Sequence, residues 1–145
     1  SKTERKKPVS LIADLLSLPH KFAVVGVSQD TTKYGYELFE VLSKNGHEVL
    51  PVNPKYHQID NQPCYPSLSE LPYTPDVVIS AISSNSAIHI ARACVDLKIP
   101  VFWMPPGTES LEAYQFCQVN HLTAIHEICP LFVLKLPRDR WQELP

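Results

Sequence analysis

Three residues that follow the first apolar run of the chain could together bind a negatively charged group. Gly26 directly follows Phe22–Val25, Ser28 comes two residues later, and Lys33 lies just before a predicted helix. If Phe22–Val25 is a strand, the turn Gly26-Val27-Ser28 offers backbone N–H groups, a hydroxyl and the amino end of the next helix to a phosphate. Lys33 would add a positive charge. A Gly-x-Ser sequence alone is equally compatible with a tight turn that binds nothing.

A second group of residues, Asn53-Pro54-Lys55, follows the next apolar run and bears on which nucleotide could bind. Domains that bind NAD usually place Asp or Glu here, where it contacts the ribose hydroxyls. A neutral Asn53 with Lys55 nearby tolerates a phosphorylated ribose, which a carboxylate would repel. NADP and coenzyme A both carry such a phosphate, so NAD is the least favoured nucleotide. Lys55 can also be read as an ordinary solvated loop charge.

Two further segments end predicted strands and would form the rim of the same cleft. Ala81, Ile82 and Ser83 follow the third strand, and Pro105 and Gly107 follow the fourth. In an open parallel sheet, ligands bind beyond the carboxyl ends of the strands, where the strand order reverses. Apolar side chains such as Ile82 and Pro105 would then flank the apolar parts of a ligand bound there.

The elements that must position these residues can be read from the apolar periodicity. Short, continuous apolar runs predict strands buried on both faces, and spacings of three and four residues predict amphipathic helices. The expected strands are 22–25, 47–52, 76–80, 101–104 and 122–125, and the expected helices are 11–17, 34–44, a short one between Pro66 and Pro72, 84–97, and one capped by Thr108 and stopped by Asn120. Segment 131–136 is apolar and could be a strand or a packed tail. This alternation predicts an α/β fold: a single doubly wound, Rossmann-like parallel five-stranded sheet with helices on both faces.

Composition excludes several classes of protein. The chain has 145 residues, 44% hydrophobic and 19% charged, with a formal net charge of −2. A near-neutral chain does not suit nucleic acid, and no apolar run reaches the about 20 residues that span a membrane. Four cysteines without a Cys-x-x-Cys pair suggest reduced thiols and a cytoplasmic protein. We expect one domain over residues 10–145 after a basic, flexible tail over residues 1–9, for which a nuclear or mitochondrial address stays open, as does a protein partner or a homo-oligomer.

Neither a metal site nor a catalytic group is expected. Cys117, His121, His126 and Cys129 do not have a familiar zinc-ligand spacing. Cys129 as a nucleophile with His126 and Glu127 is doubtful, because neighbours in an extended segment point in alternating directions. No Walker lysine, His-Glu-x-x-His or Gly-x-Ser-x-Gly motif is present. These observations favour a binding module over an enzyme.

Several segments, in consistent order over roughly residues 10–132, resemble the single-domain CoA-binding proteins, which in turn are similar to the CoA-binding domain of succinyl-CoA synthetase. The matching segments are 22–28, Val52-Asn53-Pro54-Lys55, 65–68, 76–78, Trp103-Met104 with Gly107, and Cys129-Pro130. The resemblance implies a Rossmann-like fold with a strand order like 3-2-1-4-5. It also implies a CoA or acyl-CoA ligand across Gly26–Ser28, across Asn53–Lys55 and past the third strand.

The chain departs from that family at two places. Bacterial members often carry basic residues after the third strand, where this chain has Ala81-Ile82-Ser83-Ser84, and many have Gln where it has Pro105. Without these basic side chains, a diphosphate would be bound by backbone N–H groups and hydroxyls. Two other functions stay open: an NADP-dependent oxidoreductase, with Tyr34 or His126 as proton donor, and a non-catalytic interaction protein with a vestigial cleft.

Overall fold

Five parallel strands form the central sheet of the computed structural model, which describes residues 10–145. They are β1 (Lys21–Val25), β2 (Glu48–Val52), β5 (Val77–Ser80), β6 (Val101–Met104) and β7 (Thr123–His126), in the order β2-β1-β5-β6-β7. Each predicted strand is confirmed to within a residue at either end. The strands β5 and β6 are buried at every position, because helices cover both faces of the sheet.

The expected order 3-2-1-4-5 is wrong. Counted by parallel strands alone, the order is 2-1-3-4-5, because β5 pairs with β1, with Ala23 opposite Val78, instead of lying outside β2. Outside β2 the chain makes only an isolated bridge: the Tyr65 N–H donates to the Pro51 carbonyl (3.0 Å), and the Asn53 N–H donates to the Tyr65 carbonyl (2.9 Å). The strand order therefore reverses between β1 and β5, and a ligand site is expected at their carboxyl ends.

The segment between β2 and β5 folds into short elements that the sequence did not predict fully. The strands β3 (Gln58–Ile59) and β4 (Gln62–Pro63) form an antiparallel hairpin. The predicted short helix is one 3₁₀ turn, Leu68–Glu70. The Ser67 Oγ accepts no backbone N–H of this turn; the Ser67 hydroxyl donates instead to the Glu70 carboxylate (3.1 Å).

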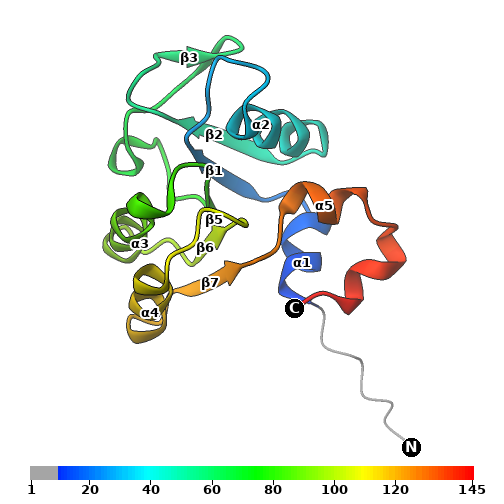
Figure 1. Cartoon of the computed structure of the whole chain (residues 1–145). Coiled ribbons are helices and arrows are strands. Elements are labelled where there is room, and N and C mark those ends of the chain that lie inside the picture. The colour runs from blue at the N-terminus through cyan, green and yellow to red at the C-terminus, as the bar shows by residue number, and fades with distance from the viewer. Residues whose placement is uncertain (1–9) are drawn as a thin grey trace, which may run out of the picture.

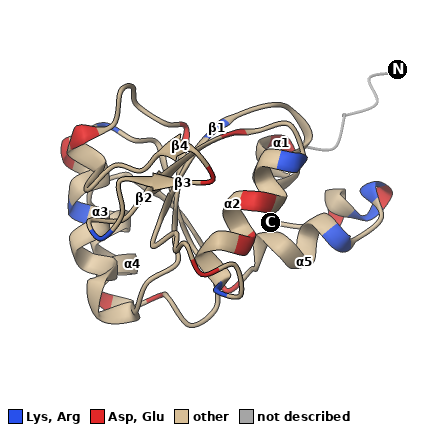
Figure 2. Ribbon diagram, turned by 90° about the horizontal axis from the view of Figure 1, so that it is seen from above, with Lys and Arg blue, Asp and Glu red and all other residues tan. Residues whose placement is uncertain are grey.

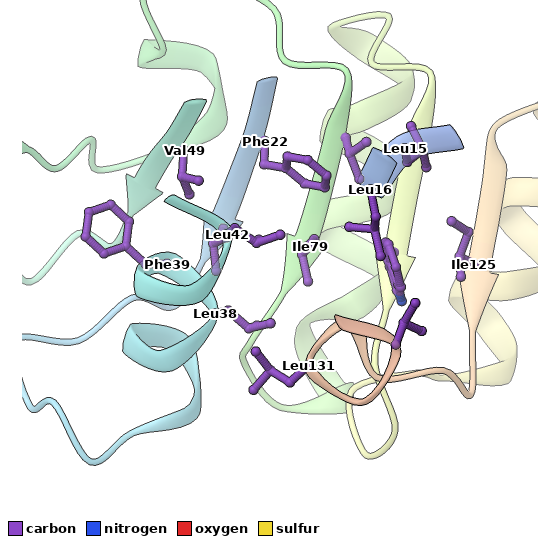
Figure 3. Packing of buried hydrophobic residues seen from close by; sticks show 14 of the residues in the cluster. Leu15, Leu16, Phe22, Leu38, Phe39, Leu42, Val49, Ile79, Ile125 and Leu131 are labelled. Carbon is purple, nitrogen blue, oxygen red and sulfur yellow. The ribbon is translucent and has the colours of Figure 1, made fainter. Parts of the chain in front are cut away.

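Helices cover both faces of the sheet, as predicted. The helices α1 (Leu11–Ser17), α2 (Tyr34–Lys44) and α5 (Pro130–Lys135) lie on one side, and α3 (Ala87–Asp96) and α4 (Leu111–Val119) on the other (Figure 1). Each layer encloses its own cluster of buried apolar side chains. In the first layer, side chains of the helices, such as Leu38 and Leu131, face Phe22 and Ile79 of the sheet (Figure 3).

Two features of the helices differ from the expectation. Ser110, not Thr108, caps α4: its Oγ accepts the Ala113 N–H (3.1 Å), while the Thr108 hydroxyl donates to the Pro105 carbonyl (2.7 Å). The helix stops at Asn120 as expected, and the left-handed residue, His121 (φ 58°), comes one position later. Segment 131–136 is neither a strand nor an irregular tail: residues 130–135 form α5, which begins at a proline, a residue that fits the first turn of a helix.

The two ends of the described chain meet. The Ser10 hydroxyl donates to the Pro145 carbonyl (2.7 Å) and its Oγ accepts the Ala13 N–H (3.3 Å), so that Ser10 caps α1 and also binds the C-terminal segment. The predicted basic tail, residues 1–9, lies outside the described residues. Within the part of the chain that is described, no helix is long and apolar enough to cross a membrane. Acidic and basic residues are interspersed over the fold instead of gathering on one face (Figure 2).

Candidate functional site

The turn after β1 depends on Gly26. Its φ of 103° lies in a region that other residues rarely adopt, and a Cβ there would come within 2.5 Å of Ile82 Cγ2 and 3.0 Å of the Ala81 carbonyl oxygen. The turn is fixed on both sides: the Gly26 N–H donates to the Val52 carbonyl and the Ala81 N–H to the Val25 carbonyl, each at 2.8 Å. The ends of β1, β2 and β5 are therefore held together at this glycine.

A second glycine, Gly35, brings α2 close to that turn. A Cβ on Gly35 would lie 2.1 Å from the Gly26 carbonyl oxygen, so only glycine lets the first turn of the helix approach so closely. In dinucleotide-binding folds, the third glycine of the fingerprint has this role. The sequence analysis did not assign Gly35 to the site; with only 4 glycines in the chain, each one is a position to inspect for such a contact.

The amino end of α2 faces the turn without a side-chain cap. Lys33 occupies the N-cap position and makes no side-chain hydrogen bond to the first turn. The loop before it is held by its own side chains: Ser28 Oγ accepts the Asp30 N–H (2.9 Å), and the Asp30 carboxylate accepts both the N–H (3.0 Å) and the hydroxyl (2.7 Å) of Thr32. The hydrogen bonds from Thr32 hold the pKa of Asp30 below its usual value. The loop is thus preformed, and the N–H groups of the helix end remain available to an anion.

Asn53 ties the end of β2 to the same turn. Its side-chain amide donates to the Val27 carbonyl (3.0 Å), and its side-chain carbonyl accepts the Lys55 N–H (2.9 Å). Val27 is fully buried, so this residue contributes only its backbone. Lys55 is exposed, with its ammonium 5.6 Å from the ring centroid of Tyr56. Asn53 is a structural link between two loops, and Lys55 is the residue there that carries free positive charge.

A cavity of about 360 Å³ opens beside these loops, between the ends of β1, β2 and β5 and the helix α3. It is lined by Val25, Val52, Pro54, Pro66, Ser67, Leu68, Ser69, Ile82, Ser86, His89, Ile90 and Ala93. Two predicted site residues, Pro54 and Ile82, are among them. The side chain of Ile82, which lines the cavity, also packs against the Gly26 position, so the cavity and the glycine turn share this residue. The serines and His89 are polar residues that sequence reasoning missed, because they come from segments far apart in the chain.

The remaining predicted site residues lie at the same edge but outside this lining. Ala81 packs against Gly26, and Ser83 is exposed at the start of the turn that leads into α3. Pro105 is buried, and Gly107 is exposed (φ 90°) with its N–H donating to the Glu109 carboxylate (3.0 Å). The structure therefore brings the residues that follow β1, β2 and β5 together, and it does not bring those that follow β6 to the cavity.

Of the residues weighed for catalysis, Cys129 contacts Tyr34 and not His126, while His126 does lie near Glu127. The Cys129 thiol lies 3.2 Å from the Tyr34 hydroxyl, while the His126 ring packs against Tyr114 (4.6 Å between centroids) and its Nδ1 lies 3.8 Å from the Glu127 carboxylate. Burial, and then the contact with Cys129, raise the pKa of Tyr34. Within residues 10–145, no cluster of three or more His, Cys, Asp or Glu side chains could hold a metal ion.

A doubly wound parallel sheet with a glycine turn, an uncapped helix end and an adjoining cavity at the reversal of strand order is a Rossmann-like fold. The chain belongs to the CoA binding domain family, whose model matches residues 20–135.

Relatives and solved structures agree with this family. An uncharacterised protein of Bacillus subtilis, YneT, is 27% identical over 118 residues, which cover 81% of this chain and 87% of that protein. A conserved hypothetical protein from Pyrococcus furiosus has a solved structure with 32% identity and a TM-score of 0.74, covering 78% of this chain and 97% of that one. ADP-forming acetate–CoA ligase II of Archaeoglobus fulgidus is 33% identical over 95 residues, which cover 63% of this chain and 14% of the ligase.

Proposed function

We propose that this protein binds coenzyme A or an acyl-CoA across the carboxyl ends of β1, β2 and β5, as a binding module with no catalytic step of its own. The observation that carries the proposal is the close approach of α2 to the turn after β1, which only glycine at positions 26 and 35 permits and which sets the uncapped amino end of that helix beside the turn. Glycines at such positions let a diphosphate reach the backbone and the helix end.

The charges around the cleft support a phosphorylated nucleotide. The cavity lining contains no Asp or Glu, and the exposed Lys55 directly follows the lining residue Pro54 in the chain. An apolar cavity with a few polar groups at its rim suits an adenine ring, whose flat faces are apolar and whose edges form hydrogen bonds. Lys55 would then face the phosphate on the ribose, and the Gly26 turn would face the diphosphate.

Calorimetric titration with CoA, acetyl-CoA, NADP and NAD tests the proposal. We expect CoA and acetyl-CoA to bind, and a ligand at about 100 times its dissociation constant to stabilise the fold by about 2.7 kcal/mol in a thermal unfolding experiment. If neither CoA nor acetyl-CoA binds at millimolar concentration, the proposal is wrong. Binding of NADP in preference to CoA would favour the oxidoreductase alternative instead.

The substitution Lys55→Glu tests the position of the ribose phosphate. It should lower the affinity for CoA about fivefold to tenfold, a modest factor because the charge is exposed. The affinity for dephospho-CoA, which lacks the ribose phosphate, should fall much less. The matched control is Lys98→Glu, the same change at an exposed lysine that follows α3, at the opposite end of that helix from the cavity. Equal losses for the two nucleotides in Lys55→Glu would remove Lys55 from this role.

A further inference from the structure

The side chain of Tyr56 reaches from the end of β2 to the turn that follows β1. Its hydroxyl lies 3.3 Å from Ser28 Oγ, and its half-buried ring packs against the apolar cluster on the α2 side of the sheet. Lys55, the residue before it, holds its ammonium 5.6 Å from the centroid of the same ring. Tyr56 thus lies between the two loops that would bind the phosphates of a nucleotide, and sequence reasoning did not single it out.

The groups around the Tyr56 oxygen are those that would bind a phosphate oxygen. Ser28 Oγ already accepts the Asp30 N–H (2.9 Å), which leaves the Ser28 hydroxyl hydrogen free to donate. The hydrogen bond from Ser28, followed by the charge of Lys55 and the backbone N–H of Gln29, holds the pKa of Tyr56 below its ordinary value. A hydroxyl, an ammonium and a backbone N–H that favour a phenolate oxygen favour a phosphate oxygen for the same reason.

We propose that the Tyr56 hydroxyl occupies the anion position at Ser28 in the ligand-free protein, and that an incoming phosphate displaces it. This inference rests on the proposed function, since it concerns how the same site is controlled. Displacement would break few contacts of the turn that carries Tyr56: Pro54 and Lys55 are exposed, the Asn53 side chain holds the Lys55 N–H (2.9 Å), and the Tyr56 N–H makes a long hydrogen bond to the Asn53 carbonyl (3.4 Å). Tyr56 therefore lowers the affinity of the site and keeps its donors paired until a ligand arrives.

The test compares CoA binding by the wild-type protein and by Tyr56→Phe in calorimetric titrations. The variant keeps the ring and loses the competing hydroxyl, so we expect it to bind CoA about twofold to tenfold more tightly, the range that one neutral hydrogen bond supplies. The matched control is Tyr73→Phe, which removes a hydroxyl that donates to Glu48 at the other end of β2. Tyr73→Phe should bind CoA as the wild type does.

The outcomes separate the two proposals. Equal or weaker CoA binding by Tyr56→Phe, with CoA bound by both proteins, overturns the displacement and leaves the proposed function standing; a weaker affinity would make Tyr56 a direct contact of the ligand. No CoA binding by either protein overturns the proposed function and this inference with it.

A spectroscopic measurement checks the displacement independently of affinity. When CoA moves the Tyr56 hydroxyl from Ser28 into water, the tyrosine absorbance should change at the long-wavelength edge of its band, where adenine does not absorb. The change is expected in the wild type and in Tyr73→Phe, and not in Tyr56→Phe. A change of the same size in all three proteins would show that another tyrosine responds, and would contradict the proposal.

Discussion

The substitution Gly35→Ala tests whether α2 must touch the turn after β1. The added Cβ would lie 2.1 Å from the Gly26 carbonyl oxygen, whereas ordinary contacts begin at 3.4 Å, so the helix and the turn must separate by about 1.3 Å. Such a separation loosens the packing of Leu38 and Leu42, which are both fully buried. Overpacking of this kind costs about 1–3 kcal/mol, which exceeds the gain of about 0.4–1 kcal/mol that alanine gives by restricting the unfolded chain.

We expect Gly35→Ala to lower the free energy of unfolding by about 1–2 kcal/mol in a urea titration. We also expect it to lower the affinity for CoA at least about tenfold, because the displaced helix end no longer meets the diphosphate. The control is Gly46→Ala. Gly46 also has a positive φ (89°), but a Cβ there meets nothing within 4 Å. That variant should lose about 1–2 kcal/mol of stability through backbone strain and keep its affinity for CoA. If Gly35→Ala is as stable as the wild type and binds CoA as well, the close approach has no role.

Two further predictions concern parts of the fold away from the cleft. Burial lowers the pKa of His47 below 6.5, so the unfolded chain takes up a proton before the folded protein does, and the free energy of unfolding falls as the pH drops from about 7.5 to 5.5. In urea titrations, His47→Asn should show a weaker pH dependence of this free energy. An unchanged pH dependence would contradict the assignment. Trp103 is fully buried and its Nε1–H donates to the Ile128 carbonyl (2.8 Å), so Trp103→Phe should lower the free energy of unfolding by about 2–4 kcal/mol through the cavity and the unpaired carbonyl. A loss below about 1 kcal/mol would mean that the core closes over the missing ring.

The strands and most helices could be predicted because their signals are local. Continuous apolar runs such as Phe22–Val25 and Val101–Met104 have few alternatives to a strand covered on both faces. The strand order was wrong because it was taken from a family resemblance. Whether β5 pairs with β1 depends on the segment before it, where Tyr65 alone lies beside β2.

The candidate site could be predicted only as far as its backbone. The carboxyl ends of the strands follow from the order of elements, and Gly26, Asn53 and Lys55 were found in this way. Gly35 and Tyr56 could not be found, because their roles depend on distances to Gly26 and Ser28 that no spacing in the sequence encodes. Thr108 was mistaken for a helix cap because two candidate caps, Thr108 and Ser110, stand two residues apart, and only the geometry decides which one caps.

The contact between Ser10 and Pro145 makes the described chain nearly a closed ring. A short peptide that joins residue 145 to residue 10 would cross little space, and the tip of the hairpin at Asp60-Asn61 offers an exposed place for new termini. A circularly permuted protein built in this way keeps every strand of the parallel sheet and its neighbours. The new termini would also lie a few residues from Tyr56 in the chain. The segment whose tyrosine is proposed to occupy the anion position would then end at a free terminus.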